Sequence, residues 1–214
     1  MKPTDPSRFT PEDLESLREA SVAGAQYAGQ AMSQLTGLAL SFSVPTVRAL
    51  PIDDVPALLG GDEAPVVALY LPIYGDGRGN ILIAMTPDAA GRLLDALCPG
   101  RSPGPPEAPD RMPPLEQSGL LETGNILAAA YLTAVSRHVR LNLIPSVPHL
   151  AVDMAGSVVD YLLVEMTRGQ DAALVIDTQL MQAGGDGRLS ARLLMLPDPD
   201  TLPEVLAALR SRRV

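Results

Sequence analysis

The amino-acid sequence predicts an α/β (α+β) fold made of two pseudo-symmetric halves, each in the order helix, three strands, helix. The first observation is an internal repeat, in which matching residues recur at a constant offset of 103 from the first helix into the following strand. The second is that apolar periodicity, helix caps and turns follow the same order in both halves. The matches are Glu19 with Glu122, Ala25 with Ala128, Ala31 with Ala134, Ser33 with Ser136, Leu38 with Leu141, Leu40 with Leu143, and Ser43-Val44-Pro45 with Ser146-Val147-Pro148.

The repeat favours a single domain over residues 1–214, with halves at residues 10–98 and 114–213. A connector at residues 99–113 joins them, and its density of prolines prevents a helix or a central strand. We expect this connector to be a passive spacer. At 214 residues, 46% of them hydrophobic, the chain can bury a sizeable core of Leu, Val, Ala and Met.

Capping residues and turns mark the elements of the first half. Thr10 is a helix cap followed by proline and two acids, Gly37 ends that helix, and Thr86 repeats the start signal. Pro45 lies within the strand predicted after the first helix, and it either confines that strand to a sheet edge or forces a bulge. The predicted elements are a helix at about 11–36, a strand at 38–49, a β-hairpin of strands 66–74 and 80–85 across the sequence GDGRG, and a helix from 87 to about 97.

The second half repeats this order. Its predicted elements are a long helix ending near Val139, a strand from Arg140 or Leu141 to Val152, a hairpin of strands 172–182 and 188–196, and a helix after residues 198–201. The periodicity of residues 155–167 does not decide between helix and strand. The hairpin turn contains a second GDGR sequence at 185–188, and the basic run Arg210, Arg212 and Arg213 suits the negative end of the last helix. We expect strands from both halves to share one sheet and the two long helices to lie side by side.

Composition excludes several classes of function. A net charge of -9 and a pI of about 4.6 argue against nucleic acid and anionic membranes as partners. The single cysteine, Cys98, cannot form an internal disulfide, and no leader or membrane span is visible in the sequence. The chain is therefore expected to be cytoplasmic.

The candidate functional residues lie on the long helix of the second half. At 100° per residue, Ser118, Glu122, Asn125 and Ala129 share one stripe with Thr133 and Ser136, and Leu120, Leu127, Tyr131 and Val135 lie roughly opposite. The outward stripe presents a carboxylate and a carboxamide, surrounded by small side chains that allow another surface to approach. No nucleophile, metal-ligand cluster or phosphate-binding loop lies nearby in the sequence. A partner must therefore supply the rest of any reaction.

The pattern Ser118, three residues, Glu122, two residues, Asn125, twenty-two residues, Pro148 resembles that of the CheC, CheX and FliY phosphatases of chemotaxis. The surrounding ETGNILAAAYLTAVS is similar to the helix of CheC, and the resemblance covers nearly the whole chain. It implies a CheC-like fold with the two motif helices packed on a shared sheet, and a helix at 155–167. Glu122 and Asn125 would be catalytic, Ser118, Ala129 and Glu19 would bind the partner, and Pro148 would be structural.

The implied activity is hydrolysis of the aspartyl phosphate of the response regulator CheY-P. The chain would need no cofactor or metal of its own, since CheY-P supplies Mg²⁺, and the receptor deamidase CheD is a second implied partner. A different class of function stays open: a non-catalytic adaptor for CheY-P or CheD, or a docking protein related to the flagellar switch.

The first half departs from the two-site pattern of the family. Glu19 is present, but Val22 stands where asparagine is expected. A valine cannot orient water, so we expect one working site. Gln26, one helical turn further on, is a poor substitute because that turn moves its amide by about 5.4 Å.

Overall fold

The computed structural model describes residues 10–166, 172–182, 189–198 and 200–210. The first half contains α1 Pro11–Thr36, β1 Leu40–Phe42, β2 Thr46–Pro51, η2 Ile52–Asp54, α2 Val55–Leu58, β3 Pro65–Gly75, β4 Gly79–Met85 and α3 Pro87–Leu97. The second contains α4 Pro114–Val139, β5 Leu143–Pro145, β6 His149–Met154, α5 Ala155–Met166, β7 Ala172–Gln182, β8 Ser190–Pro197 and α6 Leu202–Arg210. The second GDGR sequence, Arg212 and Arg213 lie outside the described residues.

The strands form one eight-stranded antiparallel sheet in the order β1-β7-β8-β4-β3-β5, with β2 also paired to β7 and β6 also paired to β3. The two halves meet at the centre, where β4 pairs with β8 and Ile83 lies opposite Leu193. The sequence prediction that both halves share a sheet is confirmed.

The internal repeat is a repeat of structure. Helices α1 and α4 have 26 residues each, and their first residues are separated by the offset that the sequence predicts. The same offset relates β1 to β5 and β2 to β6. Even a side-chain contact recurs: the Ser33 hydroxyl accepts a hydrogen bond from the Leu40 N–H at 3.0 Å, and the Ser136 hydroxyl accepts one from the Leu143 N–H at 3.1 Å.

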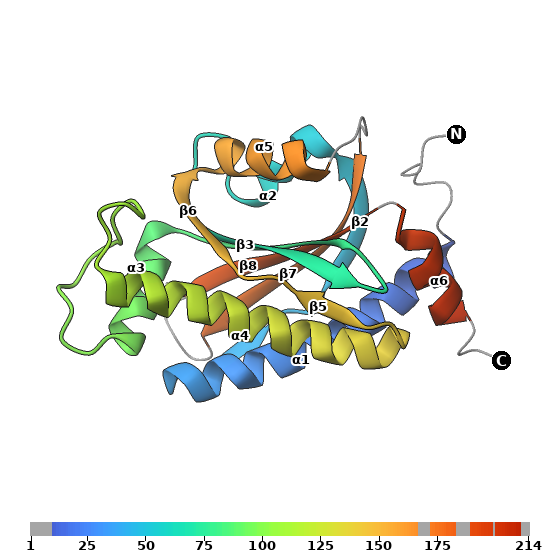
Figure 1. The fold of residues 1–214 in the computed structure, drawn as a ribbon, viewed down its shortest axis with the longest axis horizontal. Coiled ribbons are helices and arrows are strands. Elements are labelled where there is room, and N and C mark those ends of the chain that lie inside the picture. Colours follow the sequence, from blue (N-terminus) through green and yellow to red (C-terminus); the bar gives the residue numbers. More distant parts are fainter. Residues whose placement is uncertain (1–9, 167–171, 183–188, 199, 211–214) are drawn as a thin grey trace.

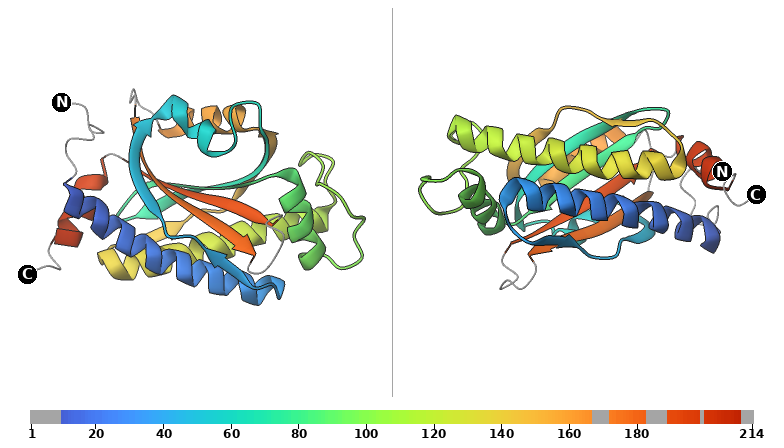
Figure 2. Two further views of the ribbon diagram at one scale, coloured as in Figure 1. Left: turned by 180° about the vertical axis from the view of Figure 1, so that it is seen from behind. Right: turned by 90° about the horizontal axis from the view of Figure 1, so that it is seen from below.

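Helices cover both faces of the sheet. α1 and α4 lie side by side across one face, whereas α2 and α5 lie on the other (Figures 1 and 2). Side chains of β4 alternate accordingly, with Ile81 and Ile83 packed in the core under α1 and α4, and Leu82 and Ala84 in the core under α2 and α5. Among the described residues, no helix is both long and apolar enough to span a bilayer.

Two details differ from the sequence prediction, and a third resolves a choice that the periodicity left open. The strand predicted after the long helix of each half is divided into two short strands, β1 and β2 in the first half and β5 and β6 in the second. Pro45 and Pro148 cause the division, because proline has no backbone N–H to donate to the neighbouring strand. The short helices η2 and α2 were not predicted. Residues 155–166 form a helix, which settles the choice that the periodicity leaves open in favour of what the resemblance implies.

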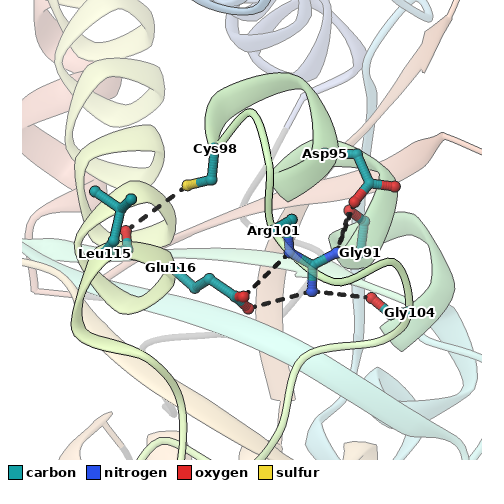
Figure 3. Close-up of polar contacts among 7 residues, drawn as sticks. All are labelled: Gly91, Asp95, Cys98, Arg101, Gly104, Leu115 and Glu116. Carbon is teal, nitrogen blue, oxygen red and sulfur yellow. Dashed lines mark hydrogen bonds and ion pairs between the residues drawn. The ribbon is translucent and has the colours of Figure 1, made fainter.

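The proline-rich connector is anchored to both of the helices that it joins. Its Arg101 side chain is only 7% exposed and forms ion pairs with Asp95 of α3 at 2.6 Å and with Glu116 of α4 at 3.2 Å (Figure 3). The Arg101 guanidinium also donates to the backbone carbonyl of Gly104 at 3.1 Å. The connector therefore ties the end of the first half to the first turn of α4.

A matching contact holds the start of α1. Asp13 and Thr10 form a capping box, and Arg210 of α6 donates to the buried Asp13 carboxylate at 2.8 and 2.5 Å. Asp13 and Glu116 are the third residues of their helices and correspond in the repeat. Thus Arg101 of the connector binds the acid at the start of α4, and Arg210 of α6 binds the acid at the start of α1.

We expect Asp13→Asn to lower the free energy of unfolding near pH 7 and to have little effect near pH 2. The hydrogen bonds from Arg210, opposed by burial, lower the pKa of Asp13 from 3.8 to about 2. Because the folded pKa lies below the unfolded one, this stabilisation is complete above about pH 4 and is lost as the pH falls toward 2. Urea unfolding of both proteins across this range measures the difference, with the exposed Glu63→Gln as control. A difference that is the same at every pH contradicts the assignment.

Candidate functional site

Helix α4 turns the predicted stripe to solvent. Glu122, Asn125 and Ser118 are exposed and Ala129 is half-buried, whereas Leu120, Leu127, Tyr131 and Val135 on the opposite face are buried in the core. The outward and inward faces are therefore those that the helical wheel predicts. Neither the Glu122 nor the Asn125 side chain has a hydrogen-bond or ion-pair partner within the part of the chain that the structure describes.

Pro148 packs against α4 at Gly124, a buried position that lies in sequence between Glu122 and Asn125. A Cβ placed on Gly124 would lie 3.5 Å from the Pro148 Cβ and 3.2 Å from the Leu69 Cδ1 of β3. Glycine at this position therefore lets α4 approach both the sheet and the β5–β6 loop closely. Pro148 in turn supports the helical turn that carries Glu122 and Asn125.

The buried tyrosine behind the site belongs to the core. Tyr131 is fully buried, and this burial raises the pKa of Tyr131 to about 12, opposed by the Ser21 hydroxyl. It lies on the face of α4 opposite Asn125. Tyr131 is thus unsuited to acid–base chemistry and instead fixes the rotation of α4 in the core.

The chemical groups at the site are limited to one acid and one amide. No group of three or more His, Cys, Asp or Glu side chains that could hold a metal occurs among the described residues. The hydroxyl on the same stripe, that of Ser118, lies two turns from Asn125 along the helix. Such a site can orient a water molecule and bind a cation, and it can do little else without a partner.

The corresponding face of α1 has different chemistry. Glu19 is exposed and Val22 is half-buried in the place that Asn125 occupies on α4. An open groove of about 780 Å³ runs between α1 and residues 40–45, with Val22, Gln26 and Val44 in its lining. Gln26 is exposed in this groove, and its role stays a prediction.

Sequence reasoning missed two features near the site. Arg101 was hidden in a connector that seemed to be a spacer, although a lone arginine between prolines, close in sequence to Glu116, is a weak signal for an ion pair. Leu115 is 69% exposed in the first turn of α4, and its position on the wheel, about 20° from Glu122, could have placed it on the functional stripe.

Structural comparison first defines the class of protein. FliY of Thermotoga maritima superposes with a TM-score of 0.73 at 14% identity, covering 95% of this chain and 98% of FliY. The middle domain of FliM from H. pylori gives a TM-score of 0.62 at 10% identity, covering 94% of this chain and 99% of that chain. At these identities the likeness establishes the fold alone, and this chain shares that fold with FliY and FliM.

The sequence comparison then gives the family. The chain is 32% identical to the CheY-P phosphatase CheC of Bacillus subtilis over 204 residues, which cover 92% of this chain and 94% of that protein. A scan against models of protein families found no match. On the strength of the identity to CheC, this chain belongs to the CheC family of CheY-P phosphatases.

We expect Gly119→Ala to stabilise the protein and Gly124→Ala to gain less or to destabilise it. Alanine in a helix is favoured over glycine by up to about 1 kcal/mol. At Gly119 the nearest atom to the new Cβ is 3.6 Å away, an ordinary contact, whereas at Gly124 the new methyl group presses on Leu69. Urea unfolding of the two variants measures the order. An equal gain in both would contradict the close packing of α4 on Pro148 and Leu69.

Proposed function

We propose that this chain hydrolyses the aspartyl phosphate of CheY-P through one site, formed by Glu122 and Asn125 on α4. The observation that carries the proposal is the outward carboxamide of Asn125, one turn from an outward acid and without an intramolecular partner in the described residues. Identity to CheC over nearly the whole chain supports the substrate class. The exposure of both side chains supports access to a partner of protein size.

The proposed role of Asn125 is to position the attacking water. A response regulator carries the phosphate on its own Asp and supplies its own Mg²⁺ and Lys, so charge neutralisation is already present. In phosphoryl transfer most of the protein's contribution is positioning and electrostatics. A carboxamide both accepts and donates hydrogen bonds, so it can hold water in line with the P–O bond. It also stays neutral beside phosphate, where a carboxylate would be repelled.

Glu122 is proposed to pair with the active-site Lys of the regulator. This charge-assisted hydrogen bond would set the register of the complex and place Asn125 over the phosphate. Ser118, Ala129 and Glu19 are the proposed partner contacts, and small side chains at 118 and 129 let the regulator approach the helix. Pro148, by packing at Gly124, would hold this turn of α4 in place.

The chain is proposed to use no metal of its own, because the Mg²⁺ required for phosphoryl transfer arrives with CheY-P. CheD remains a second proposed partner, on the family resemblance alone. The adaptor function is the second candidate, and the observation that favours it is Val22, since a first half that keeps Glu19 without an amide could bind a regulator without hydrolysing its phosphate.

We expect Asn125→Ala to reduce phosphate release from CheY-P by about 10²-fold or more, as removal of a positioned hydrogen-bonding group does elsewhere. Glu122→Ala should mainly raise KM, because it removes a binding contact. The matched control is Gln26→Ala, which removes an exposed carboxamide from α1 and should leave the rate unchanged. The assay uses CheY charged with acetyl phosphate. A full rate in Asn125→Ala would reject the catalytic role and favour the adaptor.

We also expect Val22→Asn to restore part of the activity when it is introduced into the Asn125→Ala protein. Val22 and Asn125 correspond in the repeat, and Glu19 already stands one turn before position 22. The same phosphate-release assay measures the recovery. If the double variant is as inactive as Asn125→Ala, the first half lacks more than its carboxamide.

A further inference from the structure

Two exposed apolar side chains lie near the Glu122–Asn125 pair. Leu115 in the first turn of α4 is 69% exposed, and Val147 in the β5–β6 loop is 73% exposed. Leu115 precedes Glu122 by two helical turns, about 10.5 Å, and points within about 20° of it. Val147 adjoins Pro148, which contacts the helix at Gly124. One exposed apolar group thus lies on the same stripe of the helix as the pair, and the other lies in the loop that packs on this part of α4.

Leu115 differs from what its position would otherwise favour. The corresponding residue of α1 is Glu12, an exposed acid in the first turn, where the helix dipole favours negative charge. An exposed leucine by itself is common and needs no explanation. Here, however, Leu115 replaces the acid that the helix dipole favours, and it does so in the half of the chain that carries Asn125.

The backbone that presents Leu115 is fixed by the connector. Arg101 binds Glu116, the next residue, and the Cys98 thiol lies 3.9 Å from the Leu115 carbonyl oxygen (Figure 3). A groove of about 600 Å³ adjoins Leu115 between the connector and the start of α4. The leucine is thus held outward on a rigid support beside a hollow, so it loses little backbone entropy when a partner covers it.

Val147 is held in the same way. The Ser146 N–H donates to the Pro72 carbonyl of β3 at 2.8 Å, which fixes the loop to the sheet. Its repeat counterpart, Val44, lines the α1 groove together with Val22. Since Val22 corresponds to Asn125 and Val44 to Val147, the repeat places Val147 on the side of α4 that carries Asn125.

We propose that Leu115 and Val147 are the apolar anchors that seat the receiver domain of the phosphorylated regulator over Asn125. This proposal rests on the proposed function. The nature of the partner follows from the site. An outward amide on an exposed helix can act only on a phosphate that a partner protein carries in its own active site, and the identity to CheC indicates CheY-P. Two apolar contacts near Glu122 would stop the complex from rocking about that single ion pair.

The variants Leu115→Ala and Val147→Ala test the anchors. Each should raise the Kd for CheY activated with beryllofluoride, and the KM for CheY-P, by on the order of tenfold, with kcat nearly unchanged, because burial of such a side chain contributes about 1.4 kcal/mol or more. The matched controls are Leu35→Ala, another exposed helical leucine, and Val44→Ala, the repeat counterpart of Val147. Both controls should change Kd and KM less than twofold.

Anchor variants that bind activated CheY as tightly as their controls would overturn the proposal, as would an effect confined to kcat or to self-association measured by sedimentation. Urea unfolding confirms that the variants are folded, and Leu115→Met, which keeps an apolar side chain, should retain tight binding. Failure of the proposed function is distinguishable: the wild type would then bind activated CheY through these anchors yet release no phosphate.

Discussion

The rotation of α4 about its own axis is the constraint on which the candidate site depends. Leu120, Leu127 and Tyr131 are buried against the sheet and α1, and their burial fixes every other side chain of the helix at 100° intervals. A Cβ on Gly24 of α1 would lie 2.8 Å from the Tyr131 ring, so the two long helices meet as closely as their side chains allow. The outward position of Asn125 is therefore a consequence of the core and not of any contact that Asn125 makes.

The two halves share their framework and differ in the chemistry they expose. Ser33 and Ser136 make the same contact with the following strand. Asp13 pairs with Arg210 of α6, and Glu116 pairs with Arg101 of the connector. Outward residues have diverged, from Val22 to Asn125 and from Glu12 to Leu115. The shared core can thus support two exposed faces with different chemistry. We propose that the α4 face hydrolyses the phosphate and that the α1 face, which lacks the amide, does not.

Local signals made much of this fold predictable from sequence. Caps at Thr10 and Thr86 and the repeat at a constant offset gave the long helices, the hairpins and the order of elements. The sequence did not decide between helix and strand at residues 155–166, because a helix packed on a sheet and a buried strand can show similar short apolar runs. The ion pairs of Arg101 with Asp95 and Glu116 were missed because they join residues in different elements, and such contacts produce no periodic pattern in the sequence. For the site, the outward face of Glu122 and Asn125 followed from periodicity, but the packing of Pro148 on Gly124 depends on tertiary contact and could not.

The most direct test of the central claim is a structure of this protein bound to CheY activated with beryllofluoride and Mg²⁺. The account predicts that the Asn125 carboxamide enters the regulator's site and lies within hydrogen-bond distance, about 3 Å, of a water in line with the beryllium–oxygen bond. It also predicts that Glu122 contacts the regulator's Lys. A complex in which α1 or α5 covers the phosphate site, with Asn125 still facing solvent, would contradict it.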